Sequence, residues 1–166
     1  SYYDSALRSS TGSNTLTGLL STPSGFRLGS DAGSYFTIAG GVAATNVQIV
    51  VSGAGGSTIL VTNTPWNLGA SGAFYDDGGS LTILAVTGNV WGSLLKAGNA
   101  TLRAGGAGVF PSNAIVRVGV SYSPGGTVDL NGFDQTIGGL QTGTSGTGDA
   151  FTTGVRTVTS PSATAD

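Results

Sequence analysis

A turn-and-strand unit that recurs at a regular interval constrains this chain more than any other feature of its sequence. In three stretches a Gly-Ser pair precedes a short run of Thr, Ile and Leu: 31–38 (DAGSYFTI), 53–61 (GAGGSTILV) and 76–84 (DDGGSLTIL). The aligned glycines are Gly33, Gly56 and Gly79, and looser copies begin at Gly12, Gly98, Gly126 and Gly154. The mean step between successive starts is about 23.7 residues, and self-similarity of this kind predicts structural units that stack on one another.

Each repeat unit holds two or three short strands divided by Gly, Asn-Gly or Pro turns. No window of 11 or more residues has helical spacing of apolar residues without a glycine interruption. A β-sandwich or barrel would also have short strands, but without self-similarity at this interval. In a β-solenoid each coil pairs with the next and repeats its corners, where Gly and Asn supply positive φ. We therefore predict an all-β parallel solenoid of about seven coils with ~23 residues each, roughly 34 Å long at ~4.8 Å per coil.

The N-terminal residues differ from the repeat. We expect 1–14 to form a separate segment, either a short helix or a docking segment between subunits, and 15–166 to form a single solenoid domain. Asp4 and Arg8 have the i, i+4 spacing of an ion pair on a helix, so one or two helical turns are expected within 2–9. The chain begins with Ser, which indicates a processed product or a segment of a longer protein.

The composition excludes several classes of function. The chain has no Cys, His, Met or Glu, so disulfides, thiolate chemistry and Ser-His-Asp triads are impossible. Only 8% of the 166 residues are charged, the net charge is −2, and the six cations are scattered. Nucleic-acid binding needs clustered Lys or Arg and is not expected. No apolar run approaches the ~18 residues of a membrane span, so no membrane insertion is expected.

The C-terminal part carries a more specific pattern. The stretch GNATLRAGGAGVFPSNAIVRVG, followed by GGTVDLNGFDQTIGGL and by RTVTSPSATA at 156–165, resembles the autotransporter-associated β-strand repeat. The match covers about residues 98–165. The resemblance implies a right-handed parallel β-helix on a large secreted or surface protein, where it serves as a stalk or scaffold. It implies no catalytic residues, and it places the protein outside a bacterial cell or on its surface.

Two groups of carboxylates are candidate sites. Asp129, Asn131 and Asp134 offer oxygen ligands at alternating positions, as calcium loops do, but the bidentate Glu is missing. The Asn-Gly pair alone explains a tight turn, with Asp129 directed outward, and this is the interpretation we favour. Asp31 and the Asp76-Asp77 pair could form an acid–base pair across coils. Adjacent strand residues point to opposite faces, however, and a loop with turn-forming Asp is the simpler expectation.

The aromatic residues are spread along the chain, and this distribution favours core positions over a sugar-binding row.

We expect the function of the protein to depend on the two ends of the solenoid. A solenoid has strands without partners at both ends, and little charge blocks them here. We expect end-to-end self-association through Tyr2, Tyr3, Leu7, Val158 and Pro161.

The expected function is therefore that of a structural subunit in an extracellular filament or surface fibre, not an enzyme, with no cofactor. Its partner would be a second copy of the chain. Two alternatives stay open: an adhesin module that binds extracellular glycans, and a polysaccharide-degrading β-helix enzyme, for which the scattered carboxylates give least support.

Overall fold

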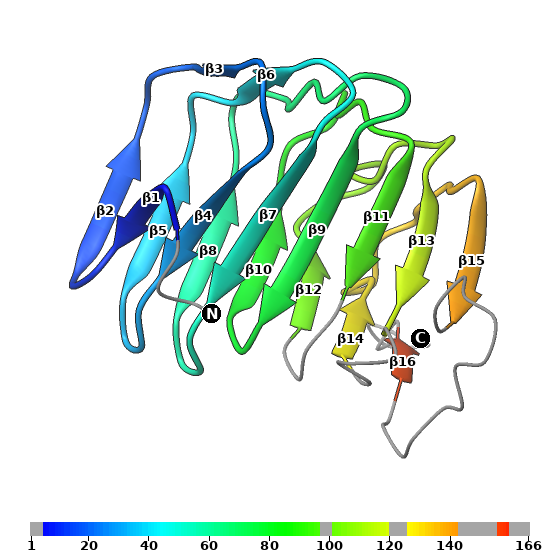
Figure 1. Ribbon diagram of the computed structural model, residues 1–166. Helices are drawn as coiled ribbons and strands as arrows, with labels where there is room; N and C mark the ends of the chain where they lie inside the picture. The colour runs from blue at the N-terminus through cyan, green and yellow to red at the C-terminus, as the bar shows by residue number, and fades with distance from the viewer. Residues whose placement is uncertain (1–4, 97–100, 120–125, 143–155, 160–166) are drawn as a thin grey trace, which may run out of the picture.

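The structure is a computed structural model that describes residues 5–96, 101–119, 126–142 and 156–159. Of Leu95, Lys96, Thr142 and residues 156–159 it describes the backbone alone. Strands dominate the described chain, and they form two long sheets and one short sheet (Figure 1).

Each long sheet contains seven strands. Sheet A has the order β1(Leu7–Ser9), β4(Phe26–Ser30), β7(Gln48–Gly53), β9(Ala73–Gly78), β11(Ser93–Lys96), β13(Ile115–Val118), β15(Gly139–Thr142). Sheet B has the order β2(Ser13–Leu16), β5(Tyr35–Ile38), β8(Thr58–Val61), β10(Leu81–Leu84), β12(Thr101–Ala104), β14(Gly126–Asp129), β16(Arg156–Thr159). Sheet C pairs β3(Leu20–Thr22) with β6(Val42–Ala44).

All the strand pairs are parallel, and successive strands of one sheet come from successive windings of the chain. The sequence interval between paired residues varies, from a short one between Ala73 and Ser93 to a long one between Gly126 and Arg156. The predicted β-solenoid with ~23 residues per turn is therefore confirmed. The described chain makes about 5 turns, fewer than the seven coils expected.

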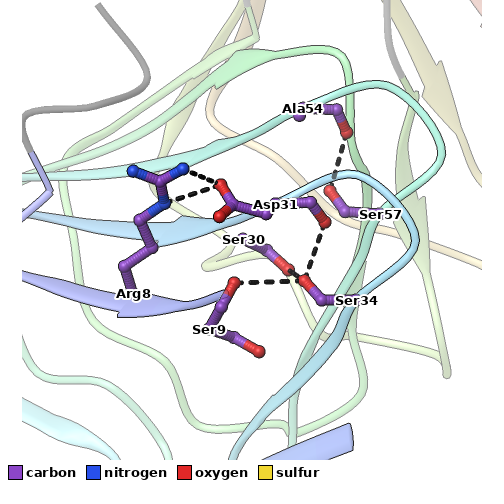
Figure 2. A network of polar contacts seen from close by, with 7 residues as sticks. All are labelled: Arg8, Ser9, Ser30, Asp31, Ser34, Ala54 and Ser57. Atoms are coloured by element: carbon purple, nitrogen blue, oxygen red, sulfur yellow. Dashed lines mark hydrogen bonds and ion pairs between the residues drawn. The ribbon is translucent and has the colours of Figure 1, made fainter. Parts of the chain in front are cut away.

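The sequence repeat marks the corner that leads into sheet B. Gly33 and Gly56 have φ values of 74° and 78°, and each lies two residues before its strand, β5 or β8. The serine that follows each glycine is buried and closes the turn: Ser34 Oγ donates to Asp31 O at 2.7 Å, and Ser57 Oγ donates to Ala54 O at 2.7 Å (Figure 2). The Gly-Ser pair thus supplies both the left-handed backbone and a local hydrogen bond.

The expectation of a helix near the N-terminus is wrong for Leu7–Ser9, which form β1. The reason is tertiary pairing: Leu7 aligns with Leu28 of β4, and the Arg8 side chain forms an ion pair with Asp31 in the next winding. One ion pair at helical spacing contributes only a few tenths of a kcal/mol, less than a strand gains by completing a sheet.

The core is a column of apolar side chains along the solenoid axis. Trp66, Phe74 and Trp91 are fully buried, with ring centroids 5.4 Å apart for Trp66–Phe74 and 5.1 Å apart for Phe74–Trp91. The core positions predicted for these aromatics are confirmed.

Amide side chains join the windings where regular strand pairing is sparse. Asn89, 6% exposed, accepts from Trp66 N at 2.9 Å and donates to Val109 O at 2.8 Å, so it joins the winding before its own to the winding after it. Gln135 accepts from Val109 N at 3.0 Å. These amides replace the backbone ladder at the corners.

Candidate functional site at the solenoid ends

The two ends of the solenoid are open edges of the same sheets. Among the strands that the structure describes, β1 and β2 each pair on one side only, as do β15 and β16 at the opposite end (Figure 1). An unpaired strand edge presents a row of N–H and C=O groups that another strand can satisfy.

At the N-terminal end, interior leucines lack the covering that internal windings have. Leu7 stacks on Leu28 in the register of sheet A, yet Leu7 is 37% exposed whereas Leu28 is 0% exposed. Leu16 and Leu20 pack against the core but are only partly buried. Within the described residues, Leu7 has a neighbouring strand on one side only, whereas Leu28 has one on each side.

The C-terminal end has the matching feature. Leu140 of β15 aligns with Val116, which is 2% exposed, while Leu140 itself is 54% exposed. A small apolar cavity of about 70 Å³ lies beside it, lined by Phe110, Val116, Val128, Leu130, Gln135, Ile137 and Leu140. The last described windings are therefore less completely packed than the middle ones.

The strands at the two ends of the solenoid contain few charged residues. Arg8 and Arg156 are the only charged residues within β1, β2, β15 and β16. The Arg8 guanidinium is held by Asp31, with Nε 2.6 Å from Oδ1 (Figure 2). Charge and Pro are the usual means of blocking an edge strand, and charge is nearly absent from these four strands.

Polar side chains of the first winding make hydrogen bonds within that winding, and its backbone accepts one from the second. Asn14 Nδ2 donates to Ser9 Oγ at 2.9 Å and to Thr11 O at 2.7 Å. Ser34 Oγ also lies 3.2 Å from Ser9 O and 2.6 Å from Ser30 Oγ (Figure 2). The first winding is thus firmly tied to the second.

Of the residues expected to take part in self-association, the structure places Leu7 at the N-terminal end and the backbone of Val158 at the C-terminal end, paired with Val128. Tyr2, Tyr3 and Pro161 lie outside the described residues. Leu7 and Val158 belong to opposite ends of the solenoid, so they could meet only between two molecules.

The candidate calcium turn is engaged in internal contacts. Asp129 Oδ2 accepts from Arg103 Nε at 2.8 Å, and Asp129 Oδ1 accepts from Asn131 N at 2.8 Å. Asn131 has φ 52° and donates through Nδ2 to Ala104 O at 3.2 Å. Asp129 lies in register with the outward Arg103 of β12 and alternates with the buried Val128, as expected of an outward residue. It is nevertheless only 6% exposed, because its carboxylate bonds Arg103 and closes the turn at Asn131. Asp134 is exposed.

The carboxylates considered for an acid–base pair are each engaged in contacts of their own. Asp76 and Asp77 lie in strand β9 rather than in the loop that we expected, because β7 and β11 pair with β9 on both sides. Asp76 is 0% exposed and accepts from Thr82 Oγ1 at 3.0 Å, whereas Asp77 lies 3.6 Å from Arg27 Nη1. Asp31 is paired with Arg8. Within the described residues no three Asp side chains gather in a group that could hold a metal ion.

Sequence reasoning missed the buried hydroxyls that line the corner between sheets A and B. Ser30, Ser52 and Ser80 are at most 3% exposed, as are Ser34 and Ser57. The Gly-Ser repeat was the signal that could have identified Ser34, Ser57 and Ser80, because each follows an aligned glycine and precedes a strand of sheet B in the same register.

The described part of the chain contains no helix with the length and apolarity to cross a membrane. Comparison with known protein families, with curated proteins and with solved structures found no match. The resemblance to the autotransporter-associated repeat over 98–165 therefore rests on the motifs themselves, among which the Asn131-Gly132 pair forms a turn with φ values of 52° and 76°.

Proposed function

We propose that this protein is a structural subunit that stacks end to end into an extracellular filament or surface fibre. The observation that carries the proposal is that both long sheets are parallel throughout and end in strands paired on one side only, beside half-exposed core leucines. A strand added to such an edge gains main-chain hydrogen bonds and covers the open core. The resemblance over 98–165 supports the extracellular location and the right-handed winding.

The strand register defines how two copies would join. Leu7, Leu28 and Val51 stack in one column of sheet A, which continues through Asp76 to Thr142. In a head-to-tail stack, β15 of one copy would lie beside β1 of the next, with Thr142 opposite Leu7. In sheet B, β16 would lie beside β2, with Thr159 opposite Thr15, since the register carries the column of Thr159 through the sheet to Thr15.

This arrangement is heterologous and does not close on itself, so it would generate a fibre rather than a ring if each copy continues the solenoid axis. Long sheets of seven strands spaced ~4.8 Å apart would give an axial repeat of roughly 34 Å. The second copy is favoured as the partner because the edge that it offers repeats the pairing found between the internal windings.

Disulfide cross-linking tests the join, since the chain has no cysteine of its own. Residues opposite each other in adjacent parallel strands are ~4.8 Å apart, within the Cα range of a disulfide. Thr15→Cys combined with Thr159→Cys should give a ladder of covalent oligomers under mild oxidation. Each single variant should give dimers at most.

The matched control combines Thr159→Cys with Thr87→Cys, an exposed residue that is not on an end strand. This pair should give no ladder. Electron microscopy of the unmodified chain should show fibres with the ~34 Å repeat. A chain that sediments as a monomer at high concentration and forms no ladder would refute the proposal.

A further inference from the structure

From β5 to β10 the outer face of sheet B is a regular surface that carries no charged residue. Along β5, β8 and β10 the residues Phe36, Ile59 and Thr82 are buried, so their neighbours in each strand point outward. We use the name sheet B face for six of the outward residues, all at least partly exposed: Tyr35, Thr58, Leu60, Leu81, Ile83 and Thr101. The register aligns them in two rows, Tyr35–Thr58–Leu81–Thr101 and Leu60–Ile83.

The outer face of sheet A differs from the sheet B face. Arg27 and Asp77 form an ion pair across it, and Arg117 donates to Gln141 Oε1 at 2.7 Å. In sheet B the first charge toward the C-terminal end is Arg103, which lies on β12 with Thr101, and Asp129 neutralises it. The aliphatic side chains of the sheet B face, Leu60, Leu81 and Ile83, are partly exposed and adjacent, and contiguous apolar patches mark interaction surfaces more often than single apolar residues do.

The shape of the surface fits a facing sheet. Strands in register make regular rows, and a hollow of about 350 Å³ lies along one border, where Gly56 and Gly79 present no side chain beside Thr58 and Leu81. Two β-sheets that pack face to face are ~10 Å apart and interdigitate their side chains. A hollow beside a row of aliphatic groups leaves room for such interdigitation.

The area of the surface indicates how the contact would work. The six residues lie on four strands ~4.8 Å apart, and together with Thr37 and Arg103, which complete the second row, they cover roughly 250 Å². A stable dimer buries ~800 Å² on each partner, so two single subunits would not remain paired through this face. In a fibre the same face recurs in every subunit along the axis, and the contacts add through multivalency.

We infer that the sheet B face joins two fibres of this chain side by side, its occupant being the sheet B face of a second copy. The inference rests on the proposed function, because it requires stacked copies. Sheet B faces of copies related by a two-fold axis would meet as identical surfaces, which suits a surface without charge. Lateral pairing therefore follows end-to-end growth and does not replace it.

The test is cryo-electron microscopy of fibres of the full chain, with the distribution of fibre widths as the readout. Two double variants alter the sheet B face: Leu81→Lys with Ile83→Lys, and Leu81→Thr with Ile83→Thr, the second placing β-branched residues, which favour strands, at both positions. The matched control is Val50→Lys, an outward, partly exposed residue of sheet A. Circular dichroism melting confirms that each variant is folded.

Wild-type and Val50→Lys fibres should be paired or bundled, whereas both double variants should give single fibres with an unchanged axial repeat. Wild-type fibres that remain single, or double-variant fibres that bundle like the wild type, would overturn lateral pairing and leave end-to-end stacking intact. The absence of any fibre would overturn both.

Discussion

Asn89 offers the sharpest test of how the windings are held together, and we predict that Asn89→Leu destabilises the fold strongly. The side chain is 6% exposed and makes three hydrogen bonds. Its Oδ1 accepts from Trp66 N at 2.9 Å, and its Nδ2 donates to Val86 O at 2.7 Å and to Val109 O at 2.8 Å. Trp66 and Val109 belong to the windings before and after that of Asn89, so a single amide ties three windings together.

Leucine has the same branched arrangement of side-chain heavy atoms as asparagine, but it leaves all three backbone groups without this partner. Each buried polar group left unsatisfied costs about 1–3 kcal/mol. The N–H of Trp66 has no second bonding site, whereas each carbonyl retains a further lone pair, so we expect a loss of about 3–5 kcal/mol in the free energy of unfolding.

Urea unfolding followed by tryptophan fluorescence is the suitable assay, because the two tryptophans, Trp66 and Trp91, are both buried near this amide. With a slope of about 2 kcal/mol/M, the midpoint should fall by about 2 M. Asn67→Leu is the control: its exposed Oδ1 accepts from Gly69 N at 3.0 Å, where water can substitute, so the loss should be under about 1 kcal/mol. An Asn89→Leu midpoint equal to that of Asn67→Leu would refute the argument.

Two further predictions concern packing and use the same urea assay. Phe74→Ala should cost about 3–5 kcal/mol, because the ring is fully buried and packs against both tryptophans. A loss below about 1 kcal/mol would show that the windings close over the cavity. Gly40→Ala should cost at least about 2 kcal/mol, since the added Cβ would overlap the backbone oxygens of Gly18 and Thr17. Gly55→Ala meets no atom within 4 Å and should change stability by no more than about 1 kcal/mol, so equal effects at the two glycines would contradict the predicted close approach of the windings.

The repeat could be recognised from sequence because its cause is local. A glycine with positive φ and the serine beside it build the same corner at Gly33 and Gly56, and strands β5 and β8 begin two residues later in both cases. The regular spacing of these corners therefore reveals the repeat even when the strands that pair in the fold are not known. Connections that vary in length, such as the long one between the paired residues Gly126 and Arg156, weaken the same signal toward the C-terminus.

What the sequence could not supply depends on contacts between windings. Asp76 and Asp77 have the composition of a turn, yet β7 and β11 hold them in a strand, where alternation sends Asp76 into the core and Asp77 toward Arg27. Likewise Gln135 reaches Val109 in the preceding winding through an amide that has no distinguishing neighbours in the sequence. Such pairings follow from the register, which becomes visible only once the windings are stacked.

The same register explains why the ends are the candidate functional surface. A winding in the middle, such as the one that contains Leu28, is covered on both sides and exposes none of that side chain. The windings with Leu7 and Leu140 expose 37% and 54% of those residues, because each lacks one neighbour in the described stack. The backbone edge and the apolar surface at each end are therefore those that an internal winding presents to its neighbour. A surface with that origin fits another coil of the same kind better than a ligand of different shape, and this is the physical basis for choosing a second copy as the partner.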